Sequence, residues 1–224
     1  KFKEKVLQKI PSKKLNLLLS IPVLNNVIRK KIKTQLGLNE QRICLTGAAP
    51  IAQSTLEWFS KIGIPILEVY GMTENFGVAT INLPGEMKFG SVGTSWENGE
   101  LKIDDNGEIL TRSGAQMKEY YKEPQKTAEV VTEDGWLRTG DKGKIEAGGY
   151  MYITGRVKDL FKTAKGKYIA PSPIEKLFST SSVVEQVCVI GQGLPSPFAV
   201  INLSEYGKGI SKEELNQKID TLKK

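Results

Sequence analysis

The chain has 224 residues, with 32 Lys and Arg against 25 Asp and Glu, a formal net charge of +7, and no histidine. Without an imidazole, these residues cannot supply a Ser-His-Asp or Cys-His hydrolase centre, or most zinc sites. Hydrophobic residues make up 39% and charged residues 25%, which is typical of a globular protein with one large or two smaller domains and excludes a disordered or fibrous one.

Cys44 and Cys188 both lie in apolar runs, so we expect buried core thiols of a reducing compartment and no disulfide. No apolar run reaches the ~18 residues of a membrane span, and the N-terminus lacks the pattern of a signal peptide. These features predict a cytoplasmic protein. The chain starts at Lys1 without an initiator Met, inside a predicted helix, which indicates a piece of a longer protein. The net charge is more typical of a solvated basic surface than of a nucleic-acid partner.

A predicted amphipathic helix covers residues 23–36, with Pro22 near its start and Gly37 just past its end. Its apolar residues recur at helical spacing: Leu24, Val27, Ile28, Ile32 and Leu36. Its cations lie on the other face: Arg29, Lys30, Lys31 and Lys33. Such a face can be simply solvated, or it can lie on the anionic inner face of a membrane; the sequence leaves both open.

Short apolar runs then alternate with a helix, which is the pattern of parallel α/β structure. We expect a strand over 43–46 and a second strand over 64–70. The helix between them is predicted to begin with the capping box Ser54-Thr-Leu-Glu57 and to end at Gly63. In such a βαβ unit, the carboxyl ends of both strands meet at one edge of the sheet.

Two loops leave this edge, 47–50 and 71–74, and they form the candidate ligand site because open α/β sheets bind ligands at the carboxyl ends of their strands. Small residues in the first loop let a flat group approach the backbone. Tyr70 offers an aromatic face, Thr73 a hydroxyl group and Glu74 a carboxylate suited to Mg²⁺. Either loop alone is more typical of a tight turn between a strand and a helix, and it is the two together on one sheet edge that indicate a site.

Residues 90–155 show repeated turn signals between short alternating strands, which predicts an antiparallel sheet or small barrel. The turns are Asn98-Gly99, Asp105-Asn-Gly107, Asp134-Gly135 and Gly148-Gly149. The final region predicts a hairpin over 157–170, a helix from Ser172 or Pro173, strands over 183–190 and 198–203, and a helix opened by the capping box Ser211-Lys-Glu-Glu214.

Two further segments carry groups that suit a nucleotide. Asp141 follows a Thr-Gly turn, and one carboxylate can accept hydrogen bonds from both hydroxyl groups of a ribose. The segment 155–162 holds three cations, Arg156, Lys158 and Lys162, at the start of the last region. They are either a basic hairpin at a domain edge or groups aimed at a phosphate or carboxylate across a hinge.

The order of these motifs resembles that of the adenylate-forming (AMP-binding) enzymes. The resemblance rests on five segments: Thr46-Gly-Ala-Ala-Pro50, Tyr70-Gly-Met-Thr-Glu74, Gly135-Trp-Leu-Arg-Thr-Gly-Asp141, Gly155-Arg-Val-Lys-Asp-Leu-Phe-Lys162 and Pro171-Ser-Pro-Ile-Glu175. Within the family, the second and fourth segments and Gly90-Ser-Val-Gly93 look most like long-chain fatty-acid–CoA ligases. The implied fold is α/β, in three parts: 1–89, the parallel βαβ end of a large adenylating domain; 90–156, its antiparallel barrel-like subdomain; and 157–224, part of a small, mobile α+β C-terminal domain.

The resemblance implies roles in a reaction that uses ATP, Mg²⁺ and coenzyme A. Five small or apolar loop residues would line the nucleotide site, the first three at the adenine and acyl pocket: Gly47, Ala48, Ala49, Gly71 and Met72. Tyr70 would stack on adenine, Thr73 would contact the α-phosphate and Glu74 would bind Mg²⁺. Asp141, helped by Arg156, would hold the ribose diol.

The last region would supply two mobile groups. Lys158 would be the hinge about which the small domain rotates, and Lys162 would face the site during thioester formation. Tyr168 lies where some long-chain ligases have a Trp near the nucleotide and acyl tunnel, although the loop before it is one residue longer here.

The implied reaction joins a fatty acid to ATP, giving acyl-AMP and pyrophosphate, and then to coenzyme A. Two segments of the family pattern are missing, the Gly-rich loop that ends in Lys and the adenylation lysine near the C-terminus, so the 224 residues alone are expected to be inactive. Two alternatives remain. Acyl-AMP could pass to a carrier protein or reductase, or the chain could bind nucleotide or membrane without catalysis.

Overall fold

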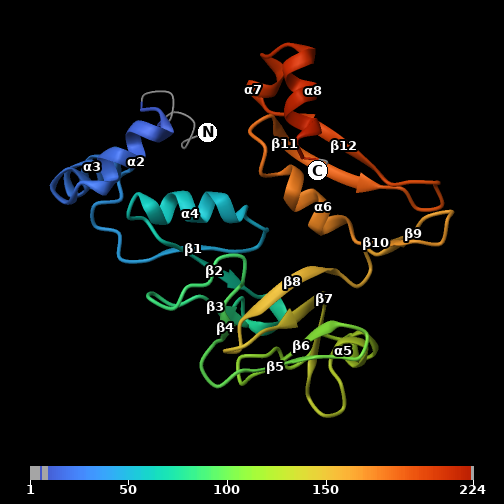
Figure 1. The fold of residues 1–224 in the computed structure, drawn as a ribbon. Coiled ribbons are helices and arrows are strands. Elements are labelled where there is room, and N and C mark those ends of the chain that lie inside the picture. Colours follow the sequence, from blue (N-terminus) through green and yellow to red (C-terminus); the bar gives the residue numbers. More distant parts are fainter. Residues whose placement is uncertain (1–5, 7–9, 223–224) are drawn as a thin grey trace.

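The computed structural model describes residue 6 and residues 10–222. Its strands form two four-stranded sheets and two two-stranded sheets, with helices on one side of the first sheet and around the last one (Figure 1). The predicted fold class is confirmed, because a parallel βαβ unit is followed by an antiparallel half-barrel and then by a small α+β region.

Three helices precede or flank the first sheet: α2 (Ser12–Ser20), α3 (Pro22–Leu36) and α4 (Gln53–Lys61). Their apolar faces meet in one core cluster with the segment that follows α4: Leu15, Leu19, Ile32, Ile62 and Ile64. Complete burial of each such side chain contributes about 1.5–3 kcal/mol to folding. This cluster therefore holds the helices against the sheet.

Helix α3 begins at Pro22 and ends at Leu36, as predicted. Gly37 follows as the C-cap residue, adopts the left-handed conformation and donates its N–H to the carbonyls of the last turn. The predicted apolar stripe is only partly buried, because Leu24 is 40% and Val27 59% exposed. The basic face also differs from expectation, since the half-buried Arg29 donates from Nη2 to the Lys61 carbonyl at 3.0 Å. None of the described helices is both long and apolar enough to cross a membrane.

The first sheet has the order β1-β2-β3-β4, from β1 (Cys44–Thr46), β2 (Ile66–Tyr70), β3 (Thr80–Ile81) and β4 (Thr94–Ser95). The predicted parallel pairing of the first two strands is confirmed, with Thr46 opposite Glu68. The predicted capping box at Ser54 is wrong. Ala52 is the N-cap residue and Ser54 lies inside α4, because the helix starts two residues earlier than the Ser-x-x-Glu pattern indicated.

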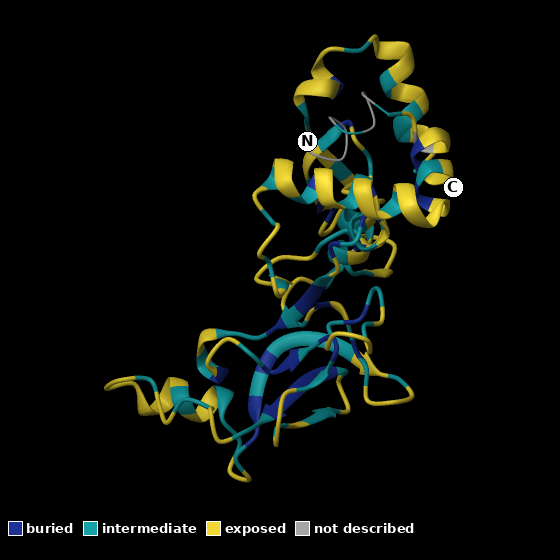
Figure 2. Cartoon of the chain, turned by 90° about the vertical axis from the view of Figure 1, so that its left-hand side faces the viewer, coloured by how far each residue is buried: buried dark blue, intermediate teal, exposed yellow. Residues whose placement is uncertain are grey.

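The half-barrel is an antiparallel sheet of order β5-β6-β7-β8: β5 (Glu100–Ile103), β6 (Glu108–Arg112), β7 (Leu137–Ile145) and β8 (Met151–Arg156). A short helix, α5 (Pro124–Val130), lies between β6 and β7. Register shifts at 108/110 and 142/143 bend the long central strand. The buried residues in Figure 2 concentrate in these strands.

The last region begins with a hairpin of β9 (Phe161–Lys162) and β10 (Tyr168–Ile169), as predicted. The remaining elements are α6 (Pro171–Phe178), β11 (Val184–Ile190), β12 (Phe198–Leu203), α7 (Glu205–Lys208) and α8 (Lys212–Asp220). The predicted cap at Ser211 is confirmed, since its hydroxyl oxygen accepts from the Glu214 N–H at 3.2 Å.

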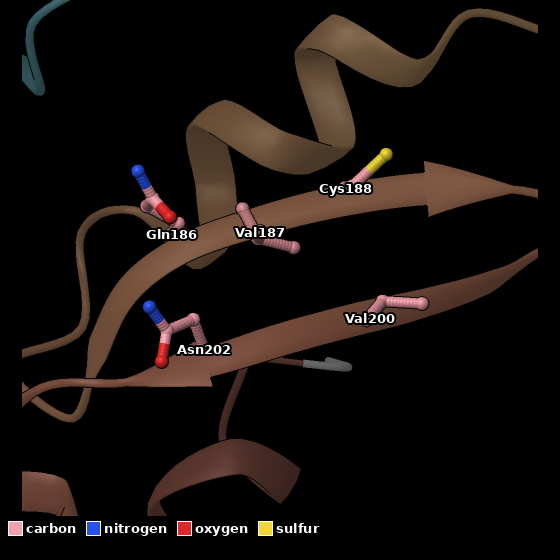
Figure 3. Close-up of a pocket in the computed structure, with 5 residues that line it drawn as sticks. All are labelled: Gln186, Val187, Cys188, Val200 and Asn202. Carbon is pink, nitrogen blue, oxygen red and sulfur yellow. The ribbon is translucent and has the colours of Figure 1, made fainter.

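Cys188 is exposed, so the prediction that it is a buried core thiol is wrong; Cys44 is half-buried, and both are free thiols. Side chains alternate along β11, and the neighbouring Val189 is buried towards α6, whose Glu175 accepts from its N–H. Cys188 therefore lies on the other face, opposite Val200 of β12. Figure 3 shows the shallow hollow on these two strands; none of its lining residues belongs to the expected nucleotide site: Gln186, Val187, Cys188, Val200 and Asn202.

The two serines give a matched test of these helix starts. Ser211→Ala removes the acceptor of the Glu214 N–H and should lower the free energy of unfolding by about 0.5–2 kcal/mol. Ser54→Ala, at an exposed position inside α4, should change it by less than about 0.5 kcal/mol, because no helix N–H depends on that hydroxyl group. Urea unfolding followed by circular dichroism measures both. Equal losses would contradict the assigned starts.

Candidate functional site

The two predicted loops leave the same sheet edge, as the parallel pairing of β1 and β2 requires. In the first loop, a Cβ atom on Gly47 would lie 3.0 Å from the Val69 carbonyl oxygen, so the loop backbone runs close against β2. Ala48 adopts a left-handed φ of 64°, and the Ala49 N–H donates to the Gly47 carbonyl at 2.8 Å. The loop exposes its small side chains and backbone. A flat group can therefore approach this surface closely.

The second loop folds back on itself through a 3₁₀ turn, Thr73–Asn75. A Cβ atom on Gly71 would lie 2.2 Å from the Gly77 carbonyl oxygen, so only glycine permits this path. The buried Asn75 accepts from the Met72 N–H at 2.8 Å, and the Gly77 N–H donates to the Met72 carbonyl at 2.9 Å. The loop is thus fixed by its own hydrogen bonds, and Thr73 stands exposed on it.

Three of the expected site residues meet at the end of β2, although 86 positions separate the first from the last. The Tyr70 hydroxyl group donates to Asp141 Oδ2 at 2.7 Å, and Arg156 Nε donates to Asp141 Oδ1 at 2.9 Å. Burial of Tyr70 raises its phenolic pKa well above the usual range. An ionised carboxylate offers about four lone pairs, so Asp141 retains acceptor capacity for a ligand.

The turn that carries Asp141 is held by Glu108, a residue that the sequence reasoning missed. Glu108 is buried; its Oε1 accepts from the Gly140 N–H at 2.9 Å, and its Oε2 accepts from Arg138 at 3.0 Å. The Thr139 hydroxyl group donates to the Ile109 carbonyl and accepts from the Asp141 N–H. The sequence signal for Glu108 is a charge placed directly before two apolar strand residues, Ile109 and Leu110. Its partners lie about 30 positions away along the chain, at separations of 30 and 32.

Glu74 is contacted by a second residue that the sequence did not single out. The Tyr120 hydroxyl group donates to Glu74 Oε1 at 2.6 Å, and this bond raises the pKa of Tyr120 to about 12. Among the described residues, no cation lies within ion-pair distance of Glu74, and no donor reaches its Oε2. The carboxylate is half-buried, so it presents one free oxygen beside Thr73.

The cations of the last region lie apart from this cluster. Lys158 is exposed in the turn between β8 and β9, and the Val157 N–H before it donates to the Gly140 carbonyl at 2.8 Å. Lys162 is exposed on β9, with its ammonium group 5.4 Å from the centre of the Tyr168 ring. Within the described chain, no hydrogen bond or ion pair joins Lys162 or Tyr168 to Tyr70, Glu74 or Asp141.

Profiles of known families match most of the chain. The profile described as AMP-binding enzyme matches residues 2–121, and that of the AMP-binding enzyme C-terminal domain matches residues 158–222. The chain belongs to the AMP-binding enzyme family. The predicted membership of this family is therefore confirmed.

Among the relatives of this AMP-binding chain, a putative fatty-acid–CoA ligase, fadD11, of Mycobacterium tuberculosis is 41% identical over 170 residues, covering 75% of the chain and 30% of the relative. Long-chain-fatty-acid–CoA ligase 5 of Mus musculus is 38% identical over 215 residues, covering 84% and 31%. The chain thus spans less than a third of the length of these relatives.

Solved structures of related enzymes share the fold. An anthranilate CoA ligase, AuaEII, in complex with anthranoyl-AMP superposes with a TM-score of 0.72 at 28% identity, covering 88% of this chain and 40% of that enzyme. The o-succinylbenzoate CoA synthetase MenE of Bacillus subtilis, in complex with ATP and magnesium, gives 0.66 at 26% identity, covering 84% and 43%.

One buried carboxylate next to the site lies outside all of the sequence motifs. Glu68 of β2 is 8% exposed, and burial raises its pKa to about 6, while the Lys176 ammonium group of α6 opposes part of the rise. An unfolded chain releases this proton near pH 4.5. The ionised carboxylate therefore lowers the stability of the folded state by about 2 kcal/mol above pH 6, and this effect fades as the pH falls towards 4.5.

Replacement of Glu68 by Gln should consequently stabilise the AMP-binding chain at pH 7.5 by up to about 2 kcal/mol and leave it nearly unchanged near pH 4.5. The difference in free energy of unfolding between variant and wild type, followed from pH 4.5 to 8, is the measurement. Glu86→Gln, at an exposed position, serves as the control for the loss of a carboxylate charge. A Glu68→Gln difference that stays constant with pH would contradict the raised pKa.

Proposed function

We propose that the protein containing these residues is a long-chain fatty-acid–CoA ligase that uses MgATP to convert a fatty acid to acyl-AMP and then to acyl-CoA. Residues 1–89 and 90–156 would belong to its large adenylating domain, and residues 157–224 to a small domain that rotates between the two steps. The observation that carries the proposal is the hydrogen-bonded cluster of Tyr70, Asp141 and Arg156 beside the Glu74 loop. The names of the relatives support the acyl class and the thiol acceptor.

The donor set at Glu74 fits the magnesium ion of MgATP. Magnesium prefers hard oxygen ligands and is usually held by one or two carboxylates together with substrate phosphates. Glu74 supplies one such oxygen without a competing cation nearby in the described chain. When bound, the ion neutralises phosphate charge. Thr73, exposed on the same turn, would donate its hydroxyl group to the α-phosphate.

The remaining edge residues would hold the nucleoside. Asp141 would accept hydrogen bonds from the two ribose hydroxyl groups through the lone pairs left by Tyr70 and Arg156. The Tyr70 ring would stack on adenine. Gly47, Ala48 and Ala49 of the first loop would line the adenine and acyl pocket. Gly71 and Met72 of the second loop would complete the nucleotide site.

In the first step, an oxygen of the fatty carboxylate attacks the α-phosphorus, and the bond to the pyrophosphate oxygen breaks with its electron pair. The nucleophile arrives ionised, so no general base is needed, which suits a chain without histidine. In the second step, the thiolate of coenzyme A attacks the acyl carbon and AMP leaves. Lys158 would be the pivot between the steps, and Lys162 would then face the acyl-phosphate.

Replacement of Glu74 by Gln removes the charge but keeps the shape and the bond to Tyr120. We expect ATP–pyrophosphate exchange by the full-length protein with a long fatty acid to fall by about 100-fold or more. Glu133→Gln, at an exposed carboxylate, is the control and should keep the wild-type rate. Unchanged exchange in Glu74→Gln would rule out the assigned role. The same assay with acids from acetate upwards identifies the acyl class.

Replacement of Lys162 by Ala should slow acyl-CoA formation from acyl-AMP by about tenfold or more, equivalent to about 1.4 kcal/mol, and leave ATP–pyrophosphate exchange within about twofold. Single-turnover measurement of each half-reaction separates the two effects. Lys165→Ala, on the same hairpin and also exposed, is the matched control. Equal losses in both half-reactions would contradict a small domain that brings Lys162 in only for the second step.

A further inference from the structure

Tyr120 joins two loops that lie far apart in the sequence. Its hydroxyl group donates to Glu74 Oε1 at 2.6 Å across 46 positions of the chain. Hydrogen bonds to an ionised carboxylate are short and about twice as strong as neutral ones. The neighbouring backbone adds a second connection, because the Met117 N–H donates to the Glu74 carbonyl at 2.7 Å. The Glu74 residue is therefore held both at its main chain and at one carboxylate oxygen.

Tyr120 is itself fixed from the other side. Its N–H donates to the Thr127 hydroxyl oxygen at 2.9 Å, and this hydroxyl group donates to the Glu123 carbonyl at 3.0 Å. Both partners belong to the start of α5. The start of α5 thus fixes the position of the phenol ring, and the ring in turn fixes the position of the Glu74 carboxylate.

The bond from Tyr120 leaves the two oxygens of Glu74 unequal. Oε1 is occupied, whereas no donor in the described part of the chain reaches Oε2. The torsion that ends a Glu side chain is broad, so a free carboxylate would rotate and present either oxygen. A carboxylate with one oxygen held offers the other in a fixed direction.

We propose that Tyr120 is a positioning residue for MgATP: its hydroxyl group holds Oε1 of Glu74 so that Oε2 faces the cation. This inference rests on the proposed role of Glu74 as the metal-binding carboxylate. The direction of the free oxygen is set when the chain folds, so cation binding does not have to restrict the rotation of the side chain. Loss of the hydroxyl group should therefore weaken cation binding without removing the ligand.

The test uses Mn²⁺ with ATP as a probe for full-length protein, with free Mn²⁺ counted by electron paramagnetic resonance. Tyr120→Phe keeps the ring, the bond from its own N–H to Thr127 and the bond from the Met117 N–H to the Glu74 carbonyl. It should raise the Mn²⁺ concentration for half-saturation by about threefold to tenfold. The Mg²⁺ concentration for half-maximal ATP–pyrophosphate exchange should rise in parallel. Tyr121→Phe is the matched control, since this neighbouring tyrosine is 82% exposed, and it should behave as wild type.

A double-mutant cycle separates positioning from general loosening of the loop. In a Glu74→Gln background, Tyr120→Phe should have no further effect on Mn²⁺ binding, whereas a loosened loop would weaken binding there as well. Wild-type Mn²⁺ affinity in Tyr120→Phe, or an equal loss in both backgrounds, would overturn the inference. If Glu74→Gln alone leaves Mn²⁺ binding intact, the proposed role of Glu74 fails first, and the two failures are distinguishable.

Discussion

The hydrogen bond from the buried Tyr70 hydroxyl group to Asp141 joins the two four-stranded sheets of the molecule. Tyr70 ends β2 of the first sheet, and Asp141 lies on β7 of the half-barrel, paired with Arg156 of β8. A hydroxyl group that is buried without a partner costs about 1–3 kcal/mol, and the bond to Asp141 avoids this cost where the two sheets meet. The pairing of β7 with β8 places Arg156 opposite Asp141, so both side chains reach the end of β2.

Local patterns accounted for most of the elements. The 3.6-residue period and the Gly37 cap predicted α3, and the turn signals predicted the half-barrel hairpins, because these features depend on neighbours only a few residues apart. The errors arose where the pattern allows two answers. Ser54 fits a capping box but lies two residues past the actual N-cap residue, and Cys188 lies in an apolar run of which one face is exposed.

The residues of the candidate site also fall into two groups, those that the sequence identified and those that it did not. The residues in contiguous motifs could be named from the sequence, since each motif carries a recognisable order of residues. Tyr120 and Glu108 could not, because each acts on a site segment about 30 or more positions away, and nothing in the surrounding residues indicates the partner. Such contacts are determined by the register of the sheets and the path of the loops, which one sequence without its fold does not reveal.

The geometry of the edge is fixed before any ligand binds. Gly71 and Asn75 lock one loop, Glu108 holds the turn of Asp141, and Tyr120 holds Glu74, all through bonds within the chain. Ordering a loop or a long side chain during binding would subtract about 0.5–1.5 kcal/mol per side chain from the affinity for a ligand. At this edge, that entropy is lost during folding, where the cores of both sheets offset it. In the proposed two-step reaction, mobility would be needed only between the steps, which agrees with the exposed positions of Lys158 and Lys162 outside the locked cluster.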